Sequence, residues 1–279
     1  MDKLNVFSIP VSIGTYNQFI STVVGDAKRR KNYYTCVANV HMLIEAYGDK
    51  NFAQTVSNAQ VIAPDGRPLT WAIRMFYGIQ QDRVAGMDLL PDLLEVCQEN
   101  EISVYFYGGH PDMTDLTKTF LEKKYPYLKI AGVYSPPFRK LTHQEEADVV
   151  KTINRSEAQI VFVSLGCPKQ EKWMAQWSSR INGVMIGIGG ALPVMVGAQK
   201  RAPKWLQNYG LEWFYRLMQE PGRLFKRYAV TNSKFIYLFL KSYLKQRFRK
   251  DDNNNSNGTN PIDFDGKLMS MRLRQLKNN

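Results

Sequence analysis

The sequence predicts an α/β fold in which helices flank a mainly parallel, Rossmann-like sheet. From about residue 3 to residue 190, short apolar runs alternate with longer segments of helical period, which is the pattern of successive β-α-β units. The chain has 279 residues, enough to bury a full core. Its hydrophobic content of 44% and charged content of 22% are ordinary for a globular protein.

Seven apolar runs are the strand candidates, because they are short and rich in β-branched and aromatic residues. They cover residues 5–9, 33–38, 60–63, 103–107, 129–134, 159–164 and 184–188. The segments between them predict helices near residues 15–24, 40–57, 67–77, 87–100, 112–125, 143–155 and 169–180. One helix start has clear local chemistry, since Thr142 followed by Glu145 is a capping box.

Basic residues are concentrated in one stretch near the C-terminus. Residues 200–250 hold 13 Lys or Arg against 2 Asp or Glu, a net charge of +11, whereas residues 1–199 carry +1 and residues 251–279 are neutral. Aromatic and aliphatic residues are interspersed with these cations, a composition that suits an anionic membrane surface. Pro221-Gly222 predicts a break between two helices. We therefore expect an α/β domain (1–200), a basic amphipathic helical appendage (201–250) and a disordered polar tail (251–279).

Several protein classes lack their sequence signals in this chain. No apolar run approaches the roughly 18 residues that span a bilayer, and the N-terminus lacks the pattern of a secretory signal, so the sequence predicts a cytoplasmic protein. Neither G-x-G-x-x-G nor the P-loop pattern occurs. Three widely spaced cysteines predict neither a disulfide framework nor a metal site. We assign no metal role to the Asp263-Phe264-Asp265 pattern in the tail and expect no cofactor.

Ligands of parallel α/β sheets bind outside the carboxyl ends of the strands, so the residues that follow each strand are the candidate site. Three of the five turns are rich in glycine, which lets backbone N–H groups approach a phosphate closely. These turns are Asn39-Val40-His41, Pro64-Asp65-Gly66, Gly108-Gly109-His110-Pro111, Leu165-Gly166-Cys167-Pro168-Lys169-Gln170-Glu171 and Gly187-Ile188-Gly189-Gly190. The sequence therefore predicts a nucleotide or sugar-nucleotide ligand.

Three of the polar side chains each allow two interpretations. Asp65 is a candidate general base, or it caps the helix that follows. Arg83 binds an anion, or it pairs with Asp88. Gln170 contacts a sugar, or it is an ordinary residue of a first helical turn.

Taken together, a set of motifs in a fixed order resembles the WecG/TagA/CpsF glycosyltransferases over about residues 3–245. The motifs are Ala63-Pro64-Asp65-Gly66, Arg83-Val84-Ala85-Gly86-Met87-Asp88, Tyr107-Gly108-Gly109-His110-Pro111, Val163-Ser164-Leu165-Gly166-Cys167-Pro168-Lys169-Gln170-Glu171-Lys172-Trp173, Arg201-Ala202-Pro203 and Leu211-Glu212-Trp213-Phe214-Tyr215-Arg216-Leu217 with Glu220-Pro221 and Arg223. Members of that family are bacterial enzymes of cell-wall or exopolysaccharide synthesis. They transfer a sugar, often N-acetylmannosamine or its uronic acid, from a UDP donor to a polyprenyl-diphosphate-linked sugar, with inversion and without a catalytic metal.

The resemblance implies roles for individual residues and a cellular location. Asp65 matches the proposed catalytic base. The substrate-binding positions are Asn39, Arg83, Gly109, Gln170, Gly189, Gly190, Arg216, Arg223 and Arg227. The basic appendage matches a segment thought to dock on the membrane and close over the active site, so the resemblance implies a peripheral protein on the inner face of the cell membrane.

Two departures from the family pattern keep other readings open. The family commonly has Thr two residues before the first-turn Asn, where this chain has Val37, and residues 191–196 differ from the usual aromatic and Asp. Altered specificity, or an inactive homologue that binds lipid, is therefore one alternative. The other is a nucleic-acid-binding protein that uses residues 200–250, although the glycosyltransferase reading expects no nucleic acid partner.

Overall fold

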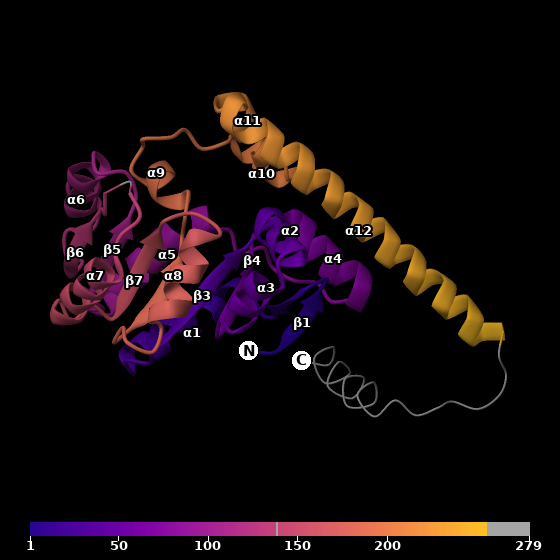
Figure 1. Cartoon of the computed structure of the whole chain (residues 1–279), viewed down its shortest axis with the longest axis horizontal. Coiled ribbons are helices and arrows are strands. Elements are labelled where there is room, and N and C mark those ends of the chain that lie inside the picture. The colour runs from indigo at the N-terminus through magenta and orange to yellow at the C-terminus, as the bar shows by residue number, and fades with distance from the viewer. Residues whose placement is uncertain (138, 256–279) are drawn as a thin grey trace. The chain divides into compact units, whose positions relative to one another are not determined.

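The computed structural model describes residues 1–137 and 139–255. The chain divides into two compact units, of which the first is Met1–Phe239 and the second begins at Leu240. The first unit contains the sheet, the helices around it and the candidate site. From β3 to α9, each strand is followed by one or two helices, as the sequence predicts (Figure 1).

The strands are β1 (Lys3–Val6), β2 (Ile9–Ser12), β3 (Tyr33–Ala38), β4 (Val61–Pro64), β5 (Val104–Gly108), β6 (Ile130–Tyr134), β7 (Ile160–Ser164) and β8 (Val184–Gly187). The helices are α1 (Tyr16–Lys28), α2 (Val40–Gly48), α3 (Lys50–Ser57), α4 (Arg67–Tyr77), α5 (Gly86–Glu99), α6 (Met113–Lys124), α7 (His143–Arg155), α8 (Lys169–Trp177), α9 (Ala191–Met195), α10 (Lys204–Asn208), α11 (Glu212–Gln219) and α12 (Pro221–Asn255).

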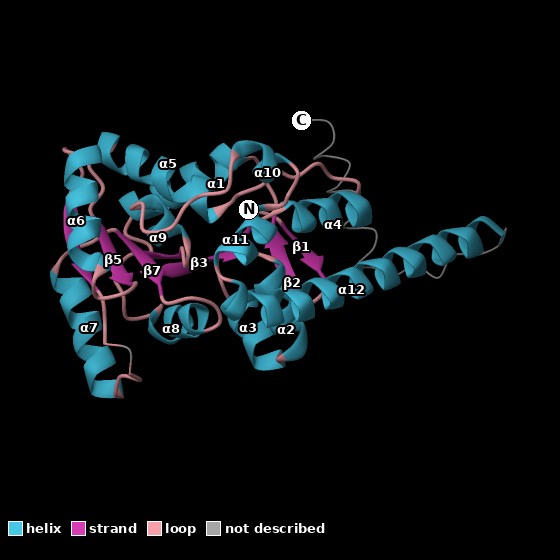
Figure 2. Cartoon of the chain, turned by 90° about the horizontal axis from the view of Figure 1, so that it is seen from above, coloured by secondary structure: helices cyan, strands magenta, loops and turns pink. Residues whose placement is uncertain are grey.

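The main sheet has six parallel strands in the order β4-β3-β8-β7-β5-β6. Its central strands are buried on both faces, which explains their near-continuous apolar sequence. Alternate residues of each strand enter two separate core clusters. One cluster lies under α2, α3, α4, α7 and α8, and the other under α1, α5, α6 and α9. Figure 2 shows α5 and α1 on one side of the sheet and α7 and α8 on the other. The predicted fold class is confirmed.

The first predicted strand, 5–9, is wrong. The chain reverses there, and β1 and β2 pair as an antiparallel hairpin separate from the main sheet. Phe7 lies in the turn at φ +55°, a conformation that two-residue hairpin turns need. No Gly or Asn marks this turn, so the alternating Val6-Phe7-Ser8-Ile9 run has the pattern of one continuous strand.

The predicted helix 40–57 is two helices that meet at Asp49. The Oδ1 atom of Asp49 accepts hydrogen bonds from the backbone N–H groups of Asn51 (2.9 Å) and Phe52 (3.1 Å). These bonds cap α3, so a new helix begins where the first one ends. The capping box at Thr142 and Glu145 is confirmed at the start of α7.

The basic segment folds into α10, α11 and α12. The break that Pro221-Gly222 predicts is present but falls at Glu220, because Pro221 already begins α12. Up to Phe239 this segment belongs to the first unit. Leu224, Phe235 and Leu238 are buried there, and the Phe235 ring packs edge-on against Phe7 at 5.9 Å between centroids. Residues 251–255, predicted as tail, continue α12. The rest of the predicted tail, including Asp263-Phe264-Asp265, lies outside the described residues. No helix in the described part of the chain is long and apolar enough to cross a membrane.

Candidate active site

The direction of the chain connections changes on each side of β8, at the carboxyl edge of the sheet. After β3 and β7 the chain turns to α2 and α8, which pack on one face of the sheet, whereas after β8 it turns to α9 on the other face. Neighbouring strands whose connections leave to opposite faces create the usual ligand position of an open α/β sheet. The predicted site residues of the β3, β4, β7 and β8 turns therefore lie around this point.

Asp65 follows the last residue of β4, and its backbone N–H donates to the carbonyl oxygen of Ala38 in the next strand (2.7 Å). The following helix, α4, begins after Gly66, whose φ of +91° turns the chain, and it has no side-chain cap. Asp65 is thus not a helix cap, and its carboxylate does not hydrogen-bond the first turn of α4. Asn39, the N-cap of α2, accepts a hydrogen bond from Met42 N–H (3.2 Å) and also hydrogen-bonds the Asp65 side chain.

The surroundings of Asp65 raise its pKa to about 7. Burial is the largest cause, because it disfavours the charged form, and the negative charge of Glu212 adds to it. The cations Arg83 and Arg216 and the Asn39 hydrogen bond act in the opposite direction. A carboxylate with this pKa changes charge near neutral pH, which is the property of a general base.

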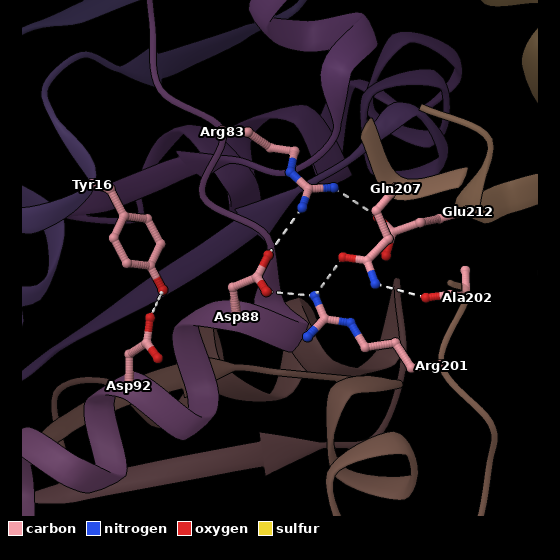
Figure 3. A network of polar contacts seen from close by, with 8 residues as sticks. All are labelled: Tyr16, Arg83, Asp88, Asp92, Arg201, Ala202, Gln207 and Glu212. Carbon is pink, nitrogen blue, oxygen red and sulfur yellow. Dashed lines mark hydrogen bonds and ion pairs between the residues drawn. The ribbon is translucent and has the colours of Figure 1, made fainter. Parts of the chain in front are cut away.

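Arg83 lies in a polar network that joins the start of α5 to the C-terminal helices (Figure 3). Its guanidinium donates to Asp88 (Nη2 to Oδ2, 3.0 Å) and to Glu212 (Nη1 to Oε2, 2.7 Å). Asp88 in turn pairs with Arg201, which also donates to Gln207 Oε1 (3.1 Å). The predicted ion pair of Arg83 with Asp88 is therefore present, and anion binding by Arg83 stays a prediction.

The glycine turn after β8 is held from two sides. Gln170, buried on the first turn of α8, accepts the Gly189 N–H at its Oε1 (3.0 Å), and its Nε2 donates to Glu171 (2.9 Å). From α11, Arg216 donates to the carbonyl oxygen of Gly190 (3.3 Å). In this structure Gln170 supports the turn, and its contact with a sugar stays a prediction.

The remaining predicted site residues are Gly109, Arg223 and Arg227. Gly109, at the end of β5, donates its N–H to Ser164 O (2.8 Å) in the neighbouring β7 turn. Arg227 lies over the ring of Tyr228, 5.1 Å from its centroid. The pKa of His41 in α2 is lowered, mainly by burial and next by the positive charge of Arg227. Arg223 pairs with Glu220 at the start of α12.

Val37, the first departure from the family pattern, does not face the other site residues. Its side chain belongs to the core cluster under α5, next to Gly86. The second departure, residues 191–196, largely forms the short helix α9. Among residues 1–137 and 139–255, no group of three or more His, Cys, Asp or Glu side chains is placed to hold a metal ion.

Glu212 and Arg201 are functional candidates to which the sequence alone assigns no role, although both lie in the motifs that carry the family resemblance. Arg83 and Glu212 are 129 positions apart, and no spacing rule connects residues so distant in sequence. One feature of the sequence does single out Glu212: residues 200–250 contain 13 cations but only two acids, so each acid there is unusual.

The end of β5 requires a glycine at position 108. Its φ is +105°, and a Cβ there would lie 2.6 Å from the backbone oxygen of Ser164. Strain and overlap with backbone both oppose a side chain, so we expect Gly108→Ala to lower the free energy of unfolding by about 3 kcal/mol. Gly48→Ala is the matched control, since no atom lies within 4 Å of its added Cβ. Urea unfolding of both variants measures this, and equal midpoints would contradict it.

Comparison with known proteins identifies the family of the chain. The model of the Glycosyl transferase WecG/TagA/CpsF family matches residues 4–249. A relative from Bacillus subtilis (strain 168) is 34% identical over 186 residues, which are 66% of this chain and 71% of the relative. A relative from Bacillus spizizenii is 30% identical over 76% of this chain and 80% of its own length. A relative from Staphylococcus aureus (strain MW2) is 26% identical over 78% of this chain and 83% of its own length.

All three relatives are named N-acetylglucosaminyldiphosphoundecaprenol N-acetyl-beta-D-mannosaminyltransferase. The family match covers nearly the whole described chain, from the β1 hairpin to α12. It includes every residue that we place in the candidate site. This chain therefore belongs to the WecG/TagA/CpsF family of glycosyl transferases and is a glycosyltransferase.

Proposed function

We propose that this enzyme transfers a sugar, N-acetylmannosamine or a related hexose or uronic acid, from a UDP donor to a polyprenyl-diphosphate-linked sugar. The transfer inverts the anomeric centre, needs no metal and serves cell-wall or exopolysaccharide synthesis. The names of the relatives support a lipid-linked acceptor and an N-acetylmannosaminyl group. The glycine-rich turns at the carboxyl edge of the sheet support a nucleotide-diphosphate donor.

The observation that carries this proposal is the placement of Asp65. Its carboxylate takes the proton of the acceptor hydroxyl as the hydroxyl oxygen forms a bond to the anomeric carbon of the donor. The bond from that carbon to the diphosphate oxygen breaks, and its electron pair leaves with UDP. One displacement of this kind inverts the anomeric centre. A base whose pKa is about 7 can accept this proton at neutral pH.

Two arginines are positioned to stabilise the charge of the departing diphosphate. The positive charges of Arg83 and Arg216 both lower the pKa of Asp65, so both guanidinium groups lie near the proposed base. Arg216 also reaches the Gly190 carbonyl oxygen in the turn after β8. Guanidinium groups bind phosphate oxygens in paired geometry and stabilise negative charge that develops during transfer. In this proposal Asn39 and Gln170 orient the donor, and Arg223 and Arg227 bind the diphosphate of the donor or of the lipid.

The C-terminal helices provide a surface for an anionic membrane. Large apolar side chains are exposed along α11 and α12, and cations accompany them. Within the first unit the exposed apolar residues include Phe214, Met218, Phe225, Val230, Ile236 and Tyr237. Such a surface binds the headgroup region through apolar burial and attraction to anionic lipids. We therefore propose that residues 1–200 form the catalytic domain and that residues 201–250 dock it on the inner face of the cell membrane and close the site.

A donor panel tests the proposed function. UDP release is measured from several UDP-sugars, with and without a short-chain polyprenyl-diphosphate-linked N-acetylglucosamine acceptor. Release from one donor that depends on the acceptor is the expected result. No release from any donor, together with no binding of UDP, would overturn the proposal and would favour the inactive lipid-binding homologue.

A further inference from the structure

Glu212 is a partly buried acid in the most basic part of the chain, with 22% of its side chain exposed. It opens α11, and its Oε2 accepts from Arg83 Nη1 at 2.7 Å. Its other carboxylate oxygen, Oε1, is buried and has no hydrogen-bond partner among the described residues. A buried, unsatisfied carboxylate oxygen is costly, so a site that retains one invites a functional explanation.

The position of Glu212 connects it to the proposed base. The backbone N–H of Val84 donates to the carbonyl oxygen of Pro64 (2.9 Å), so Arg83 and Asp65 are each one residue from the same hydrogen bond, and Arg83 also pairs with Glu212. After burial, the negative charge of Glu212 is the largest influence that raises the pKa of Asp65. We propose that Glu212 is a positioning residue for sugar transfer: α11 brings a second carboxylate to Arg83, where it fixes the guanidinium and adds a negative charge to the surroundings of Asp65. This inference rests on the proposed role of Asp65 as the base.

The charges around Asp65 come from three parts of the chain. Glu212 and Arg216 belong to α11, Arg83 precedes α5, and the neutral Asn39 caps α2. Two cations would by themselves hold the Asp65 carboxylate in its charged form with little affinity for a proton. The negative charge of Glu212 offsets them. The C-terminal segment thus supplies an acid that raises the pKa of Asp65, in addition to cationic groups that bind anions.

The test compares Glu212→Gln with the wild-type enzyme in the pH dependence of kcat/KM for the lipid-linked acceptor. Glutamine keeps an oxygen for Arg83 but removes the charge. We expect the acid limb to move to lower pH by about one unit, the size typical of one nearby like charge. The rate above pH 8 should fall by about tenfold at most, because Asp65 becomes a weaker base.

Two variants serve as controls for the charge of Glu212. Asp88→Asn removes the other acid on Arg83, so it should reduce the rate without a comparable shift of the acid limb. Glu212→Asp keeps the charge and should restore the limb toward the wild-type position. A Glu212→Gln enzyme whose rate falls while its acid limb stays in place would overturn the inference, since that result describes a structural role only.

A second measurement does not depend on turnover. Carbon-13 labelling of aspartate carboxyls allows the Asp65 resonance, assigned by its absence in Asp65→Asn, to be titrated in the wild-type and Glu212→Gln proteins. A lower midpoint in Glu212→Gln supports the inference, and an equal midpoint overturns it. If Asp65→Asn instead retains full activity, the proposed base itself fails, and this outcome is distinct from an unshifted Glu212→Gln.

Discussion

Asp65→Asn should lower kcat by about a thousandfold while UDP binding remains close to that of the wild-type enzyme. The amide has nearly the shape of the carboxylate but cannot accept the acceptor proton, and positioned bases contribute factors of this size. Donor binding should survive because the groups assigned to the diphosphate, Arg83 and Arg216, are unchanged. Single-turnover sugar transfer and calorimetric titration with UDP measure the two quantities separately.

The stability of Asp65→Asn provides its control. Because the pKa of Asp65 is raised in the folded protein, the folded state binds its proton more tightly than the unfolded state does. The resulting stability is present at low pH and is lost as the pH rises through about 7. At pH 8 the neutral amide should therefore unfold at the same or a higher temperature than the wild-type protein. Retained transfer by a well-folded variant would rule out Asp65 as the base.

Phe235→Ala should lower the free energy of unfolding by about 3 kcal/mol, in the range for loss of a buried aromatic ring. Phe235 is 8% exposed and packs against Phe7 and Phe239 at 5.9 Å between ring centroids. The next residue, Ile236, is 56% exposed on the same helix, so Ile236→Ala should change stability by less than about 0.5 kcal/mol. Urea unfolding distinguishes the two variants.

The same pair separates packing from membrane docking. Loss of an exposed isoleucine that enters the headgroup region should weaken binding to anionic vesicles by about tenfold. Vesicle sedimentation with phosphatidylglycerol-containing lipid measures the affinity under conditions where both variants are folded. Equal stability losses, or a vesicle affinity of Ile236→Ala that matches wild type, would contradict the orientation of α12 in this account.

Most of the fold could be predicted because burial on both faces leaves a strong signal in sequence. The run at 159–164, for example, became β7, with Val161 and Val163 on one face and Ile160 and Phe162 on the other. The predictions that were wrong concern two local changes of chain direction that no glycine marks in the sequence. The hairpin turn at Phe7 and the new helix start at Asp49 depend on one backbone conformation and one side-chain cap.

The candidate site was predictable only where single turns supply its residues. Asp65, Asn39 and the glycines follow strands, so the rule that ligands bind at strand ends located them. The pairing of Arg83 with Glu212 depends on where the chain brings the first turn of α11, which local sequence does not encode. The resemblance to a family indicated that the C-terminal helices matter, and the structure adds an acid to the groups they contribute.

The pH dependence of wild-type transfer most directly tests the central claim, that Asp65 is a base whose pKa is raised to about 7. The measurement is kcat/KM for the lipid-linked acceptor between pH 5.5 and 9 at constant ionic strength. The account predicts a plateau above about pH 7 and a tenfold fall for each pH unit below it, because the base must lose one proton to act. A rate that stays level down to pH 5.5 would contradict the account.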